Sequence, residues 1–312
     1  MIVIPYEPDL APSLVAAYDR SLAGVPHCYP VPVARMASAL ATAAAGAEPP
    51  PHPSGRSPHP RVPLRAGAAW LSLEGDDVIG LIHVAVAPAG EPAGIDAGAI
   101  RALWYERGRR AVGQALLDVA TDHLRAQGVA RIDAYRYEHR LPFYHVEHAY
   151  LSWRLEHVHA LLGANGYHRI DGELVLDWPD FAADDPGEPP VEVGIDLEWT
   201  PSLGARRGLI VHAVRGSDEV GVCVGTSGGE YAAAEEAEDW VYIAWLTVDE
   251  GLRGRGLGRY LLLRALHEAR AAGYRHASLC CIEHNHRALL LYTGLGFRVV
   301  DWTWAWSRDI GE

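Results

Sequence analysis

Hydrophobic residues along the chain follow two spacings, one typical of helices and one typical of strands. The run WVYIAWLTV at 240–248 is apolar at nearly every position, which predicts a strand buried on both faces. It is followed, after a short turn, by GRYLLLRALHEARAA at 258–272, whose apolar residues recur three and four positions apart and predict a helix. Two strand-like runs on either side of GSDE, within 207–226, predict a hairpin.

The same pattern predicts two similar halves. The first reads as two helices and several strands, then strand, glycine turn, helix, strand, helix and strand; the second repeats this plan without the opening helices. The fold class expected is therefore α/β with a mixed sheet. Periodicity disappears in AADDPGEPP at 182–190, which predicts domains at 1–182 and 191–312 joined by a linker at 183–190. The proline-rich stretch at 48–63 is expected to be a surface excursion within the first domain.

An internal repeat supports this division. Three landmarks recur at one offset of 145 residues: Gly113 and Gly258, Gly128 and Gly273, and the pairs Glu138-His139 and Glu283-His284. Gly128 and Gly273 stand where glycine commonly ends a helix. The next landmarks, Gly166 and Gly296, are 130 residues apart, so the first copy holds 15 extra residues around 143–156.

Charge and cysteine content exclude several classes of protein. The net charge is −13 and all 27 basic residues are arginine, so no basic stripe for nucleic acid is expected. No apolar run is long enough to span a membrane, and the first residues lack a secretory pattern, so we expect a cytoplasmic protein without a membrane partner. The four cysteines form no metal-binding spacing and are expected to be buried thiols, with no metal site.

The clearest chemical motif is the turn RGRGLG at 253–258, between the predicted strand and helix. Glycines let backbone amides approach a ligand closely, and the helix N-terminus favours negative charge, so this turn predicts a phosphate-binding loop. The glycine spacing is too short for a dinucleotide-binding turn, and no Lys-Ser/Thr pair is present for a nucleoside triphosphate loop.

This turn resembles motif A of the GNAT acetyltransferases, (Gln/Arg)-x-x-Gly-x-(Gly/Ala), through Arg253, Gly256 and Gly258. The segment NHRALLLYTGLGF at 285–297 resembles motif B of that family, through Asn285, Ala288, Tyr292, Gly296 and Phe297. The resemblance covers about residues 207–308.

The resemblance implies two tandem GNAT domains and an acetyl-CoA site in the second. The pantetheine arm is expected against the backbone of Leu246 and Val248 and beside Asn285. The remaining implied cofactor contacts lie in the loop, at Arg253, Gly254, Arg255, Gly256, Gly258 and Arg259. Tyr292 is implied as the general acid that protonates the leaving thiolate.

The general base is less well defined. Tyr242 stands where some relatives carry a glutamate, so we expect the base among the carboxylates and histidine that flank the strands, and take Glu283 as the candidate. The alternatives are Glu238, Asp239 and His284. Trp302, Trp304 and Trp306 alternate along the last strand and are expected to share a face, as packing residues or as a pocket wall.

The first copy has lost most of these residues. Gly108, Ala111 and Val112 replace Arg253, Gly256 and Leu257, and Leu162 and Leu155 replace Tyr292 and Asn285. We therefore expect a degenerate first domain that either retains CoA or is purely structural.

The predicted function is acetyl transfer from acetyl-CoA to a primary amine of a small molecule by direct attack. The expected state is a monomer, because the tandem chain already pairs two domains. The alternatives are mycothiol synthesis, which tandem members of the family also perform, and non-catalytic acyl-CoA binding.

Overall fold

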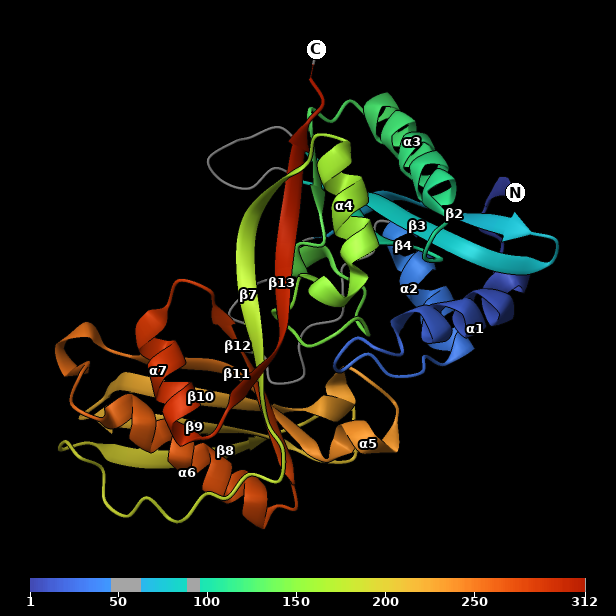
Figure 1. Ribbon diagram of the computed structural model, residues 1–312. Helices are drawn as coiled ribbons and strands as arrows, with labels where there is room; N and C mark the ends of the chain where they lie inside the picture. Colours follow the sequence, from blue (N-terminus) through green and yellow to red (C-terminus); the bar gives the residue numbers. More distant parts are fainter. Residues whose placement is uncertain (46–62, 89–95, 312) are drawn as a thin grey trace.

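The computed structural model describes residues 1–45, 63–88 and 96–311, whose strands form one mixed sheet of 13 strands (Figure 1). The order across the sheet is β1-β2-β3-β4-β5-β13-β7-β12-β11-β10-β9-β8, and β6 pairs with β13 outside this path. The predicted mixed α/β class is confirmed. The proline-rich stretch lies outside the described residues apart from Pro63.

The first half contains the two predicted opening helices. Its elements are β1 (Ile2–Pro5), α1 (Ala11–Leu22), α2 (Val33–Ala45), β2 (Arg65–Glu74), β3 (Asp77–Ala87), β4 (Ala97–Tyr105), α3 (Arg110–Ala126), β5 (Arg131–Ala134), β6 (Leu151–Ser152), α4 (Glu156–Ala164) and β7 (His168–Trp178). A strand also precedes α1, which the hydrophobic pattern did not reveal.

The second half repeats the plan without the opening helices, as predicted. Its elements are β8 (Gly194–Thr200), β9 (Gly208–Arg215), β10 (Asp218–Ser227), α5 (Glu235–Glu238), β11 (Trp240–Val248), α6 (Leu257–Ala271), β12 (His276–Ile282), α7 (His286–Leu295) and β13 (Arg298–Asp309). The hairpin around GSDE is formed by β9 and β10.

The last strand of each half pairs with the other half. Strand β13 lies between β5 and β7, with Trp306 opposite Ala134, and β7 lies between β13 and β12, with Leu176 opposite Leu279. In Figure 1 these two long strands run side by side from the upper part of the molecule into the lower part. Each half therefore supplies one strand on which the other depends.

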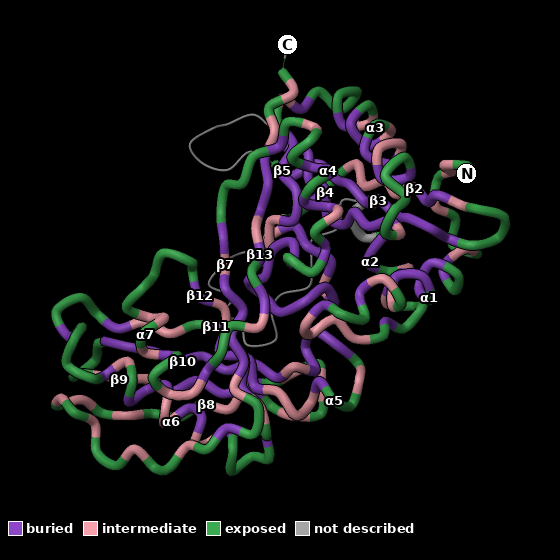
Figure 2. The backbone as a smooth tube through the Cα atoms, viewed as in Figure 1, coloured by how far each residue is buried: buried purple, intermediate pink, exposed green. Residues whose placement is uncertain are grey.

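Both β7 and β13 contain buried stretches (Figure 2), and some of their buried side chains belong to the core of the other half. Trp306 of β13 belongs to the core of the first half, whereas Leu174 and Leu176 of β7 belong to the core of the second. A fully buried leucine stabilises a fold by about 1.5–3 kcal/mol, so removing β7 would weaken the second half considerably.

Helices α3 and α6 each cover one face of a half of the sheet. Helix α6 buries Leu257, Leu261 and Ala265, among other residues, on its sheet-facing side. The residues after these helices, Gly128 and Gly273, have φ angles of +78° and +96°, a left-handed conformation that glycine adopts without strain. The predicted helix ends are confirmed.

Candidate active site

Strands β11 and β12 diverge and leave a cavity at the boundary between the halves. Their parallel pairing runs only from Trp240 opposite His276 to Ile243 opposite Leu279. Beyond it lies a cavity of about 430 Å³. The second half supplies residues 243–246, 280–285, Ala288 and Tyr292 to its wall, and the first half supplies Tyr137, His148, Tyr150 and residues 170–173 of β7.

Four of the predicted site residues meet in this cavity: Leu246, Glu283, Asn285 and Tyr292. They come from β11, from the residue after β12, and from the N-cap and the second turn of α7. Val248 and the loop 253–259 do not line the cavity.

The predicted phosphate loop has the conformation that such a loop needs. Gly254 and Gly256 have φ angles of +77° and +90°, and Gly256 is the N-cap of α6. Arg253 donates from Nε to the carbonyl of Val248 at 3.0 Å, which ties the loop to the end of β11. Amides at the start of α6 and its helix dipole together favour an anion here.

The loop also carries unneutralised positive charge. Arg255 and Arg259 are exposed, and within the described part of the chain neither forms an ion pair. Arg287 of α7, which the motif did not single out, lies close by: its Nη2 is 3.8 Å from the position that a Cβ on Gly254 would take. Three arginines are thus available near the helix N-terminus.

Tyr292 lies at the inner wall of the cavity. It is 8% exposed and packs edge-on against Phe297, with 6.0 Å between ring centroids. Burial, and then the nearby Cys281, Cys223 and Glu173, raises the pKa of its phenol. The hydroxyl therefore remains protonated at neutral pH, as a proton donor must.

Asn285 lines the cavity and also stabilises the start of α7. Its Oδ1 accepts the backbone N–H of Ala288 at 3.2 Å and so caps α7. This cap holds the helix that carries Tyr292.

The predicted base, Glu283, contacts β7, the strand that the first half supplies to the second. Its backbone N–H donates to the carbonyl of Gly172 at 3.2 Å, and its Oε2 would lie 2.8 Å from a Cβ on Gly172. The side chain is exposed. A second carboxylate, Glu173, also enters the cavity and was not predicted, because nothing in the sequence places β7 beside β12.

Tyr242, which stands where some relatives carry a glutamate, forms a hydrogen bond with a residue of the first half. Its hydroxyl lies 2.9 Å from Nδ1 of His148, and the neighbouring Tyr231 donates to Glu147 at 3.0 Å. His148, Glu147 and Tyr150 belong to the extra segment of the first copy, so this insertion forms part of the cavity wall and its support.

Of the three alternating tryptophans, Trp304 and Trp306 pack, whereas Trp302 is exposed. Trp304 and Trp306 both lie near His159 and Arg169, with the Arg169 guanidinium 4.2 Å from the Trp304 ring centroid. The strand register shifts between Ala305 and Trp306. None of the three borders the cavity.

The equivalent gap in the first half can be located through two matching glycines. A Cβ on Gly80 of β3 would lie 3.2 Å from the carbonyl of Trp104, and a Cβ on Gly221 of β10 would lie 3.3 Å from that of Thr247. Trp104 therefore matches Thr247, and the preceding Leu103 matches Leu246.

A tyrosine of the first half forms hydrogen bonds with both backbone polar groups of Leu103. The buried Tyr135 accepts the N–H of Leu103 at its hydroxyl oxygen, 2.9 Å away, and donates its own proton to the carbonyl of the same residue. Tyr135 has a φ of +59°, a conformation that is costly for a bulky residue. The backbone groups that match those of Leu246, one of the expected pantetheine contacts, are thus already paired.

Two arginines in the loop of the first half are neutralised, whereas the exposed Arg110 forms no ion pair within the described residues. Arg107 pairs with Glu156, and Arg109 donates to both carboxylate oxygens of Glu74, at 2.9 and 2.6 Å. Leu155 and Leu162, at the places of Asn285 and Tyr292, are buried in the core.

The cysteines offer no nucleophile at the cavity. Cys223 and Cys281 are buried as expected, whereas Cys28 and Cys280 are only partly buried. Burial, and then Glu173, raises the pKa of Cys281 to about 11, so the thiol stays protonated. Among the described residues, no cluster of three His, Cys, Asp or Glu side chains is arranged to hold a metal ion.

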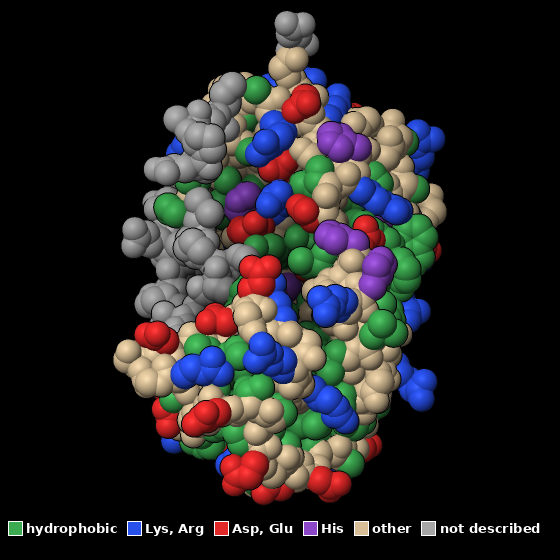
Figure 3. All heavy atoms as spheres, turned by 90° about the vertical axis from the view of Figure 1, so that its left-hand side faces the viewer, with side chains coloured by type: hydrophobic (Ala, Val, Ile, Leu, Met, Phe, Trp, Pro, Cys, Tyr) green, Lys and Arg blue, Asp and Glu red, His purple; other side chains and the backbone are tan. Residues whose placement is uncertain are grey.

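Acidic and arginine side chains are interspersed over the face drawn in Figure 3, without a continuous basic area. None of the helices in the described ranges combines the length and the apolar character that crossing a bilayer requires.

Comparison with known proteins agrees with the geometry. Residues 173–297 match the sequence profile of the Acetyltransferase (GNAT) family. No curated protein is recognisably similar in sequence. Among solved structures, a tandem GNAT protein from the clavulanic acid biosynthesis pathway aligns with a TM-score of 0.67 and 18% identity, over 100% of this chain and 99% of the other.

Two further structures have similar folds. A GCN5-related N-acetyltransferase from Sphaerobacter thermophilus aligns with a TM-score of 0.62 and 14% identity, over 100% of this chain and 96% of the other. A glucosamine N-acetyltransferase region of a fungal multi-domain β-N-acetylglucosaminidase aligns with a TM-score of 0.66 and 12% identity, over 98% of this chain and 38% of that longer one. Residues 173–297 therefore match the GNAT family of acetyltransferases, and the whole chain has the fold of the tandem GNAT proteins.

Proposed function

We propose that the chain transfers an acetyl group from acetyl-CoA to a primary amine of a small molecule, at one site in its second half. The observation that carries this proposal is the cavity between the diverging strands β11 and β12, with the glycine loop outside it and Tyr292 at its wall. In such a gap, the extended pantetheine arm of a thioester can contact the backbone groups of β11 and the proton donor Tyr292 together.

The residues fit acetyl-CoA in three parts. The amides of 254–259 and the start of α6 suit the pyrophosphate, and Arg255, Arg259 and Arg287 supply positive charge for the phosphates. The backbone of Leu246 and Val248, with Asn285, suits the pantetheine amides. Tyr292 would protonate the thiolate as the carbon–sulfur bond breaks.

Direct attack by the amine is the favoured mechanism, because Cys280 and Cys281 both have raised pKa values, chiefly through burial, and are poor candidates for an acyl-enzyme nucleophile. The carboxylates Asp171, Glu173 and Glu283 at the cavity favour a cationic acceptor over an acidic one.

We further propose that one acetyl-CoA binds per chain. The pairing of Tyr135 with Leu103 and the ion pairs of Arg107 and Arg109 support a first half that has a structural role. The chain is expected to act as a monomer in the cytoplasm, which light scattering and cell fractionation would test.

The test is thiol release from acetyl-CoA with a panel of amines, namely aminoglycosides, polyamines, amino acids, peptides, the mycothiol precursor and glucosamine. Acetylation is confirmed by mass spectrometry. Glucosamine is included because one structural neighbour is described as acting on it. Acetyl-CoA binding without transfer to any of these amines would favour an acyl-CoA-binding protein, and selective use of the mycothiol precursor would identify a mycothiol synthase.

A further inference from the structure

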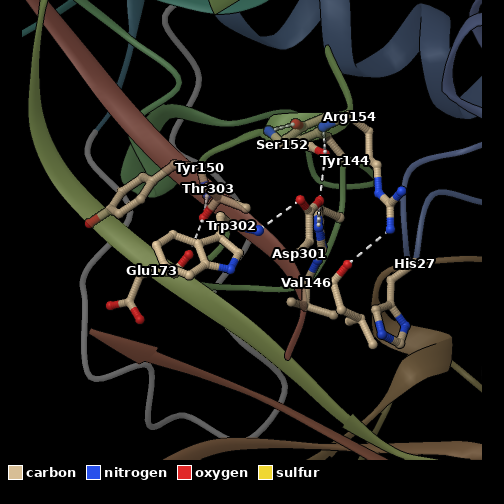
Figure 4. A network of polar contacts seen from close by, with 12 residues as sticks. His27, Tyr144, Val146, Tyr150, Ser152, Arg154, Glu173, Asp301, Trp302 and Thr303 are labelled. Carbon is tan, nitrogen blue, oxygen red and sulfur yellow. Dashed lines mark hydrogen bonds and ion pairs between the residues drawn. The ribbon is translucent and has the colours of Figure 1, made fainter. Parts of the chain in front are cut away.

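A carboxylate of the first half lies in the cavity of the second. Glu173 stands on β7, opposite Ile282 of β12 and Thr303 of β13. Its carbonyl accepts the hydroxyl of Thr303 at 3.1 Å, and that hydroxyl accepts the backbone N–H of Tyr150, also at 3.1 Å (Figure 4). Paired strands on both sides therefore fix the point from which the Glu173 side chain extends.

No cationic side chain within residues 1–45, 63–88 and 96–311 pairs with the Glu173 carboxylate. Its Oε2 is inaccessible, and no group in the described ranges forms a hydrogen bond with it. The charges that act on Glu173 are those of Asp171 and Glu283, which have the same sign. Burial, and then these two carboxylates, raises the pKa of Glu173 from 4.5 to about 8. A ligand that brings positive charge, or a proton to give away, would relieve this arrangement.

The other titratable groups around Glu173 come from both halves of the chain. They are Tyr137, His148 and Tyr150 of the first half, Cys280 and Cys281 of β12, His284 after it, and Tyr292 of α7. The tyrosines and cysteines among them have pKa values raised chiefly by burial, so they remain neutral near pH 7.

The competing bases have other contacts. Glu283 is exposed and packs against Gly172. Asp171 lies 3.5 Å from Nη1 of Arg136 in an ion pair. Tyr242 is buried and bonded to His148. Glu173 alone among these combines a place in the cavity wall with a carboxylate oxygen that lacks a partner.

We infer that Glu173 accepts the proton of the substrate ammonium, so that the strand donated by the first half completes the active site. This inference rests on the proposed acetyl transfer. The carboxylate removes one proton from R–NH3⁺, and the freed lone pair forms the carbon–nitrogen bond with the thioester carbonyl. The carbon–sulfur bond then breaks and its electron pair leaves on sulfur.

The protons balance through Tyr292. Tyr292 gives its proton to the thiolate and regains one from the nitrogen as the intermediate collapses. The products are the N-acetyl amide, the CoA thiol and one proton, which Glu173 returns to solvent.

The test compares Glu173→Gln with Glu138→Gln, using the best amine of the panel. Glu138 is a carboxylate of the same half, held 3.0 Å from Nη2 of Arg136 and outside the cavity wall. Glu173→Gln is expected to bind acetyl-CoA like the wild type and to lose about 100-fold or more in kcat/KM. It should also lose the increase in kcat/KM that the wild type shows as the pH approaches 8, whereas Glu138→Gln should retain that increase.

A Glu173→Gln protein with the rate and pH profile of the wild type would overturn the inference, as would a profile that disappears only in Glu283→Gln. If the wild type acetylates no amine, the proposed function fails. The protonation of Glu173 can then be tested separately, by infrared spectroscopy of the protein as the pH is raised. A carboxylic acid band that disappears between neutral and alkaline pH, and is missing in Glu173→Gln, supports a poised acceptor. The absence of such a band contradicts it.

Discussion

At the scale of single residues, Tyr292 offers a direct test of the proton donor. Tyr292→Phe removes only the hydroxyl and keeps the packing against Phe297. We expect kcat to fall about 10- to 100-fold while acetyl-CoA binding is retained, because general acid catalysis acts on the transition state. Steady-state kinetics and calorimetric binding measure the two effects.

The matched control is Tyr274→Phe, which alters another buried tyrosine of the second half, whose hydroxyl donates to the carbonyl of Arg207 at 2.9 Å. This variant is expected to lose stability but not kcat. Equal loss of kcat in both variants would assign the Tyr292 effect to folding.

Glu173 also predicts how stability depends on pH. Its folded-state pKa is raised to about 8, so between pH 4.5 and 8 the folded protein holds a proton that the unfolded chain has released. This group therefore lowers stability as the pH rises through that window, by up to about 1.4 kcal/mol per pH unit. Glu173→Gln should be more stable than the wild type at pH 9 and gain less at pH 5, as measured by thermal unfolding; a gain equal at both values would refute the pKa shift.

The cavity residues on β11 and at α7 could be predicted from the sequence, but those of the first half could not. Leu246, Asn285 and Tyr292 line the cavity because they lie on elements whose local pattern is clear. Glu173 reaches the cavity through the exchanged strand β7, and His148 and Tyr150 reach it through the insertion. Neither the strand exchange nor the insertion leaves a spacing of residues that could be recognised in the sequence.

Among the helices and strands, the turn before α6 requires a left-handed conformation at two glycines, Gly254 and Gly256. Gly256 has a φ of +90°, and a Cβ there would lie 3.4 Å from Pro190. Gly256→Ala should destabilise the protein by about 1–2 kcal/mol and weaken acetyl-CoA binding, because a left-handed conformation is costly for alanine.

Gly251→Ala is the control, since Gly251 lies in the turn that precedes the same loop but has open space at its Cβ position and no positive φ. Denaturant unfolding and calorimetry with acetyl-CoA compare the two. Unchanged binding in Gly256→Ala would show that the loop does not hold the cofactor.

The elements themselves were largely predictable, whereas their pairing was not. Amphipathic spacing and terminal glycines indicated α3 and α6, and continuous apolar residues indicated β11. The partners of β7 and β13 are set by contacts between residues far apart in the chain, to which local periodicity is blind. The division at 183–190 remains a prediction.

At the scale of the whole molecule, exchanged strands make the halves interdependent. Residues 191–312 alone would lack β7, whose Leu174 and Leu176 belong to their core. We expect residues 1–182 and 191–312 to be unstable when produced separately, and to form a complex that binds acetyl-CoA when produced together. Residues 191–312 that fold and bind acetyl-CoA alone would contradict this dependence.

We propose that this duplicated fold retains one acetyl-CoA site, in its second half. Isothermal titration calorimetry of the full chain with acetyl-CoA counts the sites directly. The pairing of Tyr135 with Leu103 predicts one acetyl-CoA per chain. Binding of two acetyl-CoA molecules per chain, or of none, would contradict a single site in the second half.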